Sequence, residues 1–326
     1  MKKVLVTGAG GFIGSHLVEK LVQKGHEVKV FVRYNARGSW GWLEGSECTD
    51  NIEVVSGDIR DADIVRHAVR GVDTVFHLAA LIGIPYSYVS PEAYVETNIK
   101  GSLNIFQAAK DFGVKKVIHT STSEIYGTAE FVPIHEKHPV NPQSPYAASK
   151  SAADSLSLSF FRSFDLPVVV VRPFNTYGPR QSARAIIPTI ITQILGGNKR
   201  IRLGSLTPTR DFTYVEDTVN GFMRAGETGM GTGEIINLGN NSEISIGDLA
   251  CLISQLMGVK ITILEDNKRK RPVKSEVDRL MADNSKARRI LKWTPTHNLE
   301  QGLKKTIAWF KEGDNFKKYK SEIYNV

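Results

Sequence analysis

Three glycines that follow a short apolar run constrain the fold of this chain more than any other feature. Val4-Leu5-Val6 predicts a buried strand, and Gly8, Gly11 and Gly14 lead from it into a helix predicted over 15–24. A second strand comes next. Glycines at such a turn let a pyrophosphate approach the backbone, and the helix N-terminus then faces the phosphates. The first gap is one residue longer than in the G-x-G-x-x-G pattern, but the order of elements predicts a dinucleotide-binding site.

The end of the second strand, predicted at 28–32, indicates which dinucleotide binds. An acidic side chain there accepts a hydrogen bond from the adenosine ribose 2′-OH, whereas an arginine suits a 2′-phosphate. The run Val32-Arg33-Tyr34-Asn35 contains no acid. We therefore expect NADP, with NAD as the alternative if Arg33 is an ordinary solvated loop residue.

Strands and helices alternate over the first 175 residues. This alternation predicts an α/β fold with a doubly wound parallel (Rossmann) sheet, which binds ligands at the carboxyl ends of its strands. Ala79, the run 121–124 and Asn175 all follow predicted strands, so they should converge on one crevice. The predicted strands lie at 52–55, 74–80, 117–119 and 168–171, and the predicted helices at 61–70, 91–112 and 146–164.

The alternation loosens after Asn175, which predicts a smaller, discontinuous substrate-binding domain in the C-terminal half. We expect residues 1–175 and 211–239 to form the dinucleotide-binding domain, and residues 176–210 and 240–326 to form the second domain. Loops are predicted at 36–50 and 202–210, a late strand at 235–238, and helices at 186–196, 216–226, 246–257 and 300–311.

Tyr146 and Lys150 form a candidate catalytic pair. If 146–164 is helical, their spacing places them one turn apart on one face. A lysine at that distance favours the phenolate and should lower the pKa of Tyr146, which makes it a usable base for a sugar hydroxyl. The pattern by itself is weak, because an ordinary amphipathic helix also contains it. It gains force from Ser121-Thr122-Ser123-Glu124, which follows a neighbouring strand.

Composition excludes several other classes of function. The 326 residues are 41% hydrophobic and 23% charged, as in globular proteins that fold in water. The net charge of +8 is dispersed, so nucleic acid is a poor candidate partner, whereas an anionic substrate fits. Two cysteines, no metal-ligand spacing, no signal peptide and no membrane-spanning run predict a cytoplasmic protein without a metal. His77 lacks a partner at ligand spacing and is better interpreted as a core histidine.

Together these stretches resemble the extended short-chain dehydrogenase/reductase family, in its nucleotide-sugar epimerase/dehydratase branch. The resemblance covers nearly the whole chain. It rests on the following motifs: Gly8-x-x-Gly11-x-x-Gly14, Gly57-Asp58-Ile59-Arg60, His77-Leu78-Ala79-Ala80, Tyr146-x-x-x-Lys150, Arg172-Pro173-Phe174-Asn175-x-Tyr177-Gly178-Pro179-Arg180 and Arg210-Asp211-Phe212.

The resemblance implies roles for individual residues. Lys150 would also hold the nicotinamide ribose, and Thr122 would hydrogen-bond the reacting hydroxyl. The diphosphate of a nucleotide sugar would be held by Asn175, Arg210 and Arg271, and Asp58 could accept a hydrogen bond from the adenine. The other predicted cofactor contacts are Gly8, Gly11, Phe12, Ile13, Gly14, Arg33, Ile59, Leu78, Ala79, Ala80, Asn98, Tyr146 and Pro173, and the other predicted substrate contacts are Ser87 and Arg184.

The run 121–124 separates the reactions of this branch. By resemblance, 4-epimerases carry a small residue at the place of Glu124, whereas 4,6-dehydratases carry Asp-Glu, an acid for C6 and a base for C5. Here Ser123 replaces that Asp, and UDP-glucuronate decarboxylases also show Thr-Ser-Glu. The stretches 34–42, 81–88 and 271–280 look like dehydratases of the legionaminic-acid type, which act on a nucleotide-linked N-acetylglucosamine.

We therefore expect a 4,6-dehydratase of UDP- or GDP-GlcNAc with a tightly held, recycled cofactor. The C6 acid, the UDP or GDP donor, and the product (a 4-keto-6-deoxy sugar or a 5,6-ene) stay open. The alternatives are a UDP-glucuronate decarboxylase, a UDP-sugar 4-epimerase and a non-catalytic NADP-binding sensor. The family usually dimerises through two helices, predicted here at about 94–112 and 146–164, which implies a homodimer.

Overall fold

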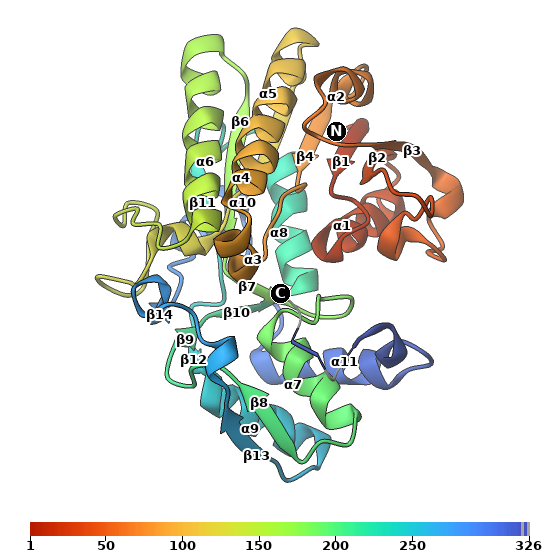
Figure 1. The fold of residues 1–326 in the computed structure, drawn as a ribbon. Coiled ribbons are helices and arrows are strands. Elements are labelled where there is room, and N and C mark those ends of the chain that lie inside the picture. The colour runs from red at the N-terminus through yellow and green to blue at the C-terminus, as the bar shows by residue number, and fades with distance from the viewer. Residues whose placement is uncertain (321–322, 325–326) are drawn as a thin grey trace.

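The computed structural model describes residues 1–320 and 323–324. Its upper lobe contains a parallel sheet of seven strands (Figure 1). Most of these strands are short apolar runs rich in valine and are buried on both faces, which is the pattern of a parallel sheet covered by helices. In spatial order they are β11 (Ile235–Leu238), β6 (Val168–Pro173), β5 (Lys116–Thr120), β4 (Thr74–His77), β1 (Lys3–Thr7), β2 (Glu27–Arg33) and β3 (Ile52–Gly57).

This strand order confirms the predicted doubly wound sheet, because the chain starts at β1 and winds outward in both directions. Two groups of helices cover it. The first group packs together as α2 (Ala62–Val69), α5 (Gly101–Asp111) and α6 (Pro145–Phe164), and the second as α1 (Phe12–Gln23), α8 (Val215–Glu227) and α10 (Ser285–Leu291).

The helix predicted over 91–112 is interrupted. It consists of α4 (Pro91–Tyr94), a π-helical turn over Val95–Lys100 and then α5. A π turn contains one extra residue and is common at functional sites. This one carries Asn98, whose amide binds both backbone groups of Leu81. Hydrophobic periodicity cannot reveal such an insertion. The short helix α3 (Ile84–Val89) precedes this segment.

The lower lobe contains three helices and three small sheets (Figure 1). The predicted loop over 202–210 is partly wrong, since it includes strand residues whose partners lie far along the chain. The helices are α7 (Ile186–Leu195), α9 (Ile246–Met257) and α11 (Leu299–Lys311). The sheets pair β8 (Arg200–Leu203) with β13 (Thr262–Glu265), β9 (Thr209–Arg210) with β12 (Ile244–Ser245) and β14 (Arg279–Leu280), and β7 (Asn175–Tyr177) with β10 (Phe212–Tyr214).

The two lobes share one hydrophobic core. Val4 and Val6 from the sheet belong to the same buried cluster as Ile187 and Ile190 from α7. The chain also crosses between lobes more than once, because β11 completes the large sheet and α10 packs on β11 and α8. Among the described residues, no helix has both the length and the apolar character needed to cross a membrane.

Candidate active site

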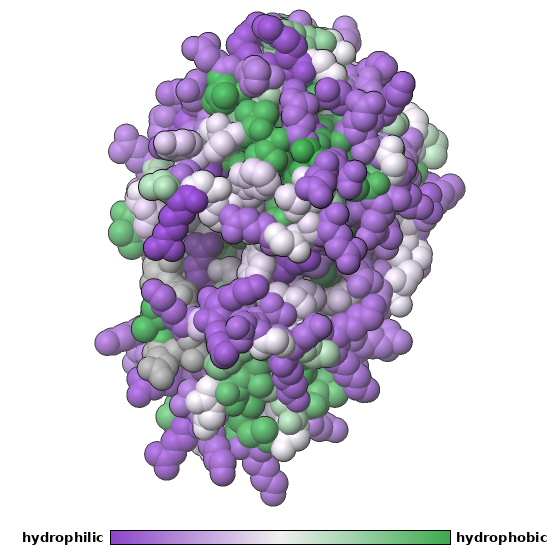
Figure 2. Space-filling model, turned by 90° about the vertical axis from the view of Figure 1, so that its right-hand side faces the viewer, coloured by the Kyte–Doolittle hydropathy of each residue, from purple (hydrophilic) through white to green (hydrophobic). Residues whose placement is uncertain are grey.

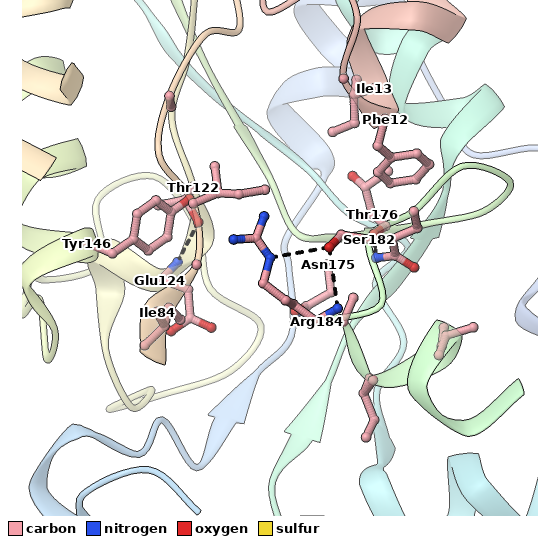
Figure 3. A pocket seen from close by; sticks show the side chains of 18 of the residues that line it. Phe12, Ile13, Ile84, Thr122, Glu124, Tyr146, Asn175, Thr176, Ser182 and Arg184 are labelled. Carbon is pink, nitrogen blue, oxygen red and sulfur yellow. Dashed lines mark hydrogen bonds between the residues drawn. The ribbon is translucent and has the colours of Figure 1, made fainter. Parts of the chain in front are cut away.

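A cavity of about 890 Å³ lies between the lobes, at the carboxyl ends of the sheet strands. Figure 2 shows the surface hollowed between the upper and lower parts of the molecule. The glycine turn lines one end of this cavity, and arginines of the lower lobe line the other. Thr122, Glu124 and Tyr146 lie on one wall, opposite Phe12 and Ile13 (Figure 3).

The glycine turn fits a bound pyrophosphate. Gly8 has φ 67°, a conformation that favours glycine, and a Cβ on Gly14 would lie 2.2 Å from the carbonyl oxygen of Gly8. Helix α1 begins at Phe12, earlier than predicted, and no side chain caps its N-terminus at Gly11. The first amides of α1 therefore remain available to an anion.

A loop after β2 covers this turn. The amide of Trp42 donates to the carbonyl of Gly10 (3.0 Å), and Gly41 approaches the same group closely. Arg33 lines the cavity but is exposed to solvent. Two predicted cofactor contacts, Asp58 and Ile59, do not line it: Asp58 is held by Arg60 through bonds of 2.7 and 3.0 Å.

The run 121–124 forms the turn after β5 that carries the candidate catalytic groups. Thr122 is the N-cap of a 3₁₀ turn over Ser123–Tyr126, and its Oγ1 accepts from the amide of Glu124 (3.2 Å). In Figure 3 the ring of Tyr146 reaches from α6 towards Thr122, and the carboxylate of Glu124 lies beside them. The hydroxyls of Thr122 and Tyr146 and the carboxylate of Glu124 thus face the same part of the cavity.

The predicted effect of Lys150 on Tyr146 is not found. Burial raises the pKa of Tyr146 above its ordinary value, and the hydroxyl of Thr122 acts in the opposite direction. Lys150 does not line the cavity and is itself 3% exposed. Burial lowers the pKa of Lys150 to about 8, against the effect of Asp154. Desolvation therefore outweighs the neighbouring charge that we expected to decide the titration of Tyr146.

A cluster of two carboxylates and two guanidinium groups lines the cavity below this wall. Arg271 Nη1 lies 3.4 Å from Glu124 Oε2 and 3.7 Å from Glu276 Oε1. Arg210 Nη2 lies 3.4 Å from the same Glu276 oxygen. Burial lowers the pKa of Arg210, and the carboxylates oppose this. Both arginines remain cations that can bind a diphosphate.

Two further side chains project into the cavity from the segment after β6. The Nδ2 atom of Asn175 is buried without a hydrogen-bond partner, which suits a group that binds a ligand. Arg184 points towards Thr122 and Tyr146 in Figure 3, and its Nη1 lies close to Gly83. Both side chains line the cavity, and their contact with a substrate stays a prediction.

Two other predicted contacts lie outside the cavity. Asn98 is fully buried and hydrogen-bonds Leu81 and Ser149, so it connects two segments next to the cavity without lining it. The hydroxyl of Ser87 is buried and donates to the carbonyl of Ile84. The predicted residues that do line the cavity are Gly8, Gly11, Phe12, Ile13, Gly14, Arg33, Leu78, Ala79, Ala80, Thr122, Ser123, Glu124, Tyr146, Pro173, Asn175, Arg184, Arg210 and Arg271.

Other lining residues were missed by sequence reasoning. Glu276 lies within a stretch that we had selected by resemblance, but nothing in the sequence pairs it with Arg210 or Arg271. Residues of the loop after β2 also lie in a stretch selected by resemblance, 34–42, but nothing in that stretch marks them as lining a cavity. The missed residues with polar or aromatic side chains include Asn35, Ser39, Trp40, Gln181, Arg202, Arg269 and Glu276. The described residues contain no cluster of three or more side chains suited to a metal ion.

Comparison with known proteins places this site in a family context. The family model described as GDP-mannose 4,6 dehydratase matches residues 5–306. The chain is 35% identical to a UDP-glucose 4-epimerase of Mycolicibacterium smegmatis, over 95% of this chain and 98% of the relative. It is 36% identical to a UDP-N-acetyl-alpha-D-glucosaminuronate decarboxylase of Bacillus cytotoxicus, over 96% and 99%.

A solved dehydratase has the same fold and contains the cofactor. The structure of DesIV, a dTDP-glucose 4,6-dehydratase from Streptomyces venezuelae with NAD bound, matches with a TM-score of 0.87 and 31% identity. The match covers 96% of this chain and 98% of DesIV. These three similar proteins carry the names of three different reactions, so similarity alone does not select one.

Proposed function

The chain belongs to the GDP-mannose 4,6-dehydratase family of nucleotide-sugar enzymes, and within it we propose a 4,6-dehydratase that acts on a nucleotide-linked N-acetylglucosamine. It is an enzyme, so the alternative of a non-catalytic sensor no longer applies. The cofactor is a nicotinamide dinucleotide, and NAD, which DesIV binds, is the supported form. NADP, which Arg33 led us to expect first, remains a matter for measurement.

The glycine turn supplies the binding site for this cofactor. The uncapped N-terminus of α1 would hold the pyrophosphate of the cofactor. At the end of β4, the small side chains of Ala79 and Ala80 would leave room for its nicotinamide ring. When bound, the cofactor would supply the hydride chemistry, which is oxidation of the sugar at C4 and return of the hydride at C6. All other steps fall to side chains of the chain itself.

Tyr146 is placed to take the proton from the C4 hydroxyl, while Thr122 hydrogen-bonds the same oxygen. Both groups face the cavity from neighbouring elements (Figure 3). Because burial raises the pKa of Tyr146, nearby positive charge must favour its phenolate during reaction. Lys150, one turn further along α6, is the side chain that we propose for that role.

Glu124 carries the proposal. A ketone at C4 makes the C5 proton acidic, and Glu124 offers a carboxylate to remove it beside Tyr146 (Figure 3). Loss of the C6 hydroxyl as water then gives the 5,6-ene, which hydride return converts to the 4-keto-6-deoxy sugar. Ser123 is too weak an acid to protonate the leaving hydroxyl alone. Either Glu124 passes on its captured proton, or Ser123 relays one from water.

Arg184 favours a second candidate, a decarboxylase of a nucleotide-linked uronate. Such an enzyme needs a cation at the sugar C6 carboxylate, and the guanidinium of Arg184 points towards Tyr146 across the cavity (Figure 3). The relative from B. cytotoxicus is named as such a decarboxylase. The third candidate, a 4-epimerase, needs no base at C5 and therefore leaves Glu124 without a role.

A turnover assay with a panel of nucleotide sugars tests these candidates. UDP-GlcNAc, GDP-GlcNAc, UDP-glucose and UDP-glucuronate should each be incubated with the purified enzyme, and products identified by mass and NMR. We expect loss of water from one of the GlcNAc nucleotides. Loss of carbon dioxide from the uronate, or inversion at C4 with no loss of mass, would replace the proposal with its rival.

The homodimer also remains a proposal. Helices α5 and α6 contact one another, and their outer faces expose Leu103 (38%) and Phe164 (52%). A second copy that packs the same two helices would cover this surface with two-fold symmetry. Light scattering at micromolar concentration should give twice the chain mass, and a monomer would refute the assembly.

A further inference from the structure

Beneath the cavity, α6, β5 and β6 enclose buried charged groups that the proposed reaction does not use. Asp154 lies one turn after Lys150 on α6 and is 3% exposed. Its Oδ2 accepts from Ser121 Oγ (2.7 Å) and from Nε and Nη2 of Arg172 (3.1 Å each). Its Oδ1 lies 3.2 Å from His119 Nε2, without the alignment of a hydrogen bond.

These contacts tie three elements together at the floor of the active site. Ser121 comes directly before Thr122, at the end of β5, and Arg172 lies in β6. The helix that carries Tyr146 is therefore joined through Asp154 to the turn that carries Thr122 and Glu124. A shift of this junction would move the proposed base and its partner hydroxyl relative to one another.

The same carboxylate balances buried positive charge. Lys150 and Arg172 are both 3% exposed, and Asp154 hydrogen-bonds Arg172 and lies one turn from Lys150 on α6. The other carboxylate nearby, Glu124, faces the cavity and pairs with Arg271. Two unpaired cations in such a place would be costly, so Asp154 offsets a large penalty.

The remaining titratable groups around Asp154 do not supply negative charge. From β5, His119 stacks on His77 of β4, and burial lowers the pKa of each ring, so both stay neutral near pH 7. From the turn after β5, Tyr126 accepts from Arg172 Nη1 (2.9 Å), and burial raises its pKa. Tyr146 is likewise protonated at rest.

We infer that Asp154 is a positioning residue: it holds the turn 121–124 against α6 and keeps Lys150 protonated beneath Tyr146. This inference rests on the roles proposed for Tyr146 and Lys150. The titration behaviour agrees with the geometry. The pKa of Lys150 is lowered to about 8 by burial, and Asp154 is the group that acts against this fall. Burial disfavours the charge on Asp154, but Arg172 and the hydroxyl of Ser121 still hold its pKa below the ordinary value.

Asp154→Asn tests the charge with little change of shape. The measured quantity is the rate of the first half-reaction, in which a nucleotide sugar reduces the bound nicotinamide. The absorbance of the reduced cofactor gives this rate at each pH from 6 to 9.5. Without the carboxylate of Asp154, Lys150 should lose its proton more easily. The alkaline limb of the pH–rate profile should therefore move about one pH unit lower. The rate at pH 8 should fall about fivefold, because the protonated fraction of Lys150 falls from about one half to about one tenth, and most of this loss should disappear at pH 6.5.

A second measurement follows the thermal stability of the protein instead of its activity. The folded-state pKa of Lys150, about 8, lies below its ordinary 10.5, so the folded chain binds this proton more weakly. Stability from this group is therefore lowest below pH 8 and rises towards pH 10.5. Asp154→Asn should increase this loss, so its thermal destabilisation should be greatest near pH 6 and shrink as the pH passes 8.

Ser121→Ala is the matched control, because it removes one hydrogen bond to Asp154 but no charge. It should lower the rate, leave the alkaline limb in place and destabilise equally at pH 6 and 9. If Asp154→Asn does not fold, the double variant Asp154→Asn with Arg172→Met should be more stable and fold, since it also removes one of the two cations that Asp154 balances. The same shift of the limb is expected in the double variant.

The outcomes test the role of Asp154 independently of the final reaction that the enzyme catalyses. A limb that stays in place in Asp154→Asn, together with a pH-independent destabilisation, would reduce Asp154 to an ordinary structural residue. The half-reaction is shared by dehydratases, epimerases and decarboxylases, since each oxidises C4. The test of Asp154 therefore stands even if the final product proves not to be the dehydrated sugar.

Discussion

The two ends of the cavity are lined by different kinds of chemical group. The glycine end uses backbone: Gly8, Gly11 and Gly14 lie within one turn of chain, and the amides of α1 face outward. The other end uses charged side chains, and Glu124, Arg210, Arg271 and Glu276 come from distant segments. We expect the first end to bind a dinucleotide pyrophosphate through backbone groups. The second is where members of one family can diverge in substrate and reaction.

The sharpest test of this contrast is Glu124→Gln, which removes the proposed base and leaves Tyr146 in place. Overall turnover should fall about 10²–10⁴-fold, as expected when general base catalysis is lost. Reduced nicotinamide should accumulate beside a 4-keto sugar, because the first half-reaction survives. Absorbance of the reduced cofactor and the rate of product release measure both effects.

Tyr146→Phe is the companion variant and should abolish reduction of the cofactor altogether. In heavy water the intact enzyme should place one solvent deuterium at C5 of the product, since the base exchanges its proton. Normal turnover by Glu124→Gln, or a product without that deuterium, would show that Glu124 is not the base and that the reaction is another.

Arg210→Ala should weaken the side-chain end without touching the glycine end. Arg210 is 6% exposed and lines the cavity, so it should form charge-assisted bonds to a diphosphate. Loss of such bonds costs about 1.5–3 kcal/mol, which corresponds to about 10- to 100-fold in affinity for UDP or GDP. Titration calorimetry with the nucleoside diphosphates should show this change, while NAD affinity stays constant.

Arg279→Ala is its control. Arg279 lies on the neighbouring strand, pairs with Glu243 at the surface and does not line the cavity. This variant should bind nucleoside diphosphates like the starting protein. Equal losses in the two arginine variants would mean that general positive charge, and not the cluster, holds the diphosphate.

Gly14→Ala addresses the backbone end. The new Cβ would lie 2.2 Å from the carbonyl oxygen of Gly8, so α1 or the turn must shift. Overpacking of this kind costs about 1–3 kcal/mol, and we expect cofactor affinity to fall about tenfold. Gly229→Ala is the control, because nothing lies within 4 Å of its Cβ position. Fluorescence titration with NAD should separate the two, and equal affinities would refute the tight turn.

The same contrast explains what the sequence could predict. The sheet, the glycine turn and most helices follow from short-range patterns, such as the apolar run of β6 and the glycine spacing. The pairing of β8 with β13 and the contacts of Glu276 depend on distant segments, so no local pattern marks them. The π turn that contains Asn98 is likewise unmarked by periodicity, and Asn98 bonds Leu81 in another segment.

The expected phenolate at Tyr146 failed for a related reason. Spacing on α6 places Lys150 one turn away, as predicted, but it does not reveal how deeply both groups are buried. Burial raises the pKa of Tyr146 and lowers that of Lys150, so the pair resists charge instead of sharing it. The sequence predicted that Tyr146 and Lys150 lie one turn apart, whereas their protonation states depend on how deeply the fold buries them.

The smallest expected effect concerns the choice between NADP and NAD. Arg33 is the feature of the glycine end that depends on a side chain, and it is exposed to solvent where it lines the cavity. An exposed ion pair contributes at most about 1 kcal/mol. Arg33→Ala should therefore weaken NADP binding about two- to fivefold and leave NAD binding unchanged, as measured by dissociation constants on the apo protein. If the starting protein binds NAD more tightly and the variant changes neither constant, Arg33 is a solvated loop residue. The glycine end would then bind its cofactor through backbone alone, as the comparison of the two ends suggests.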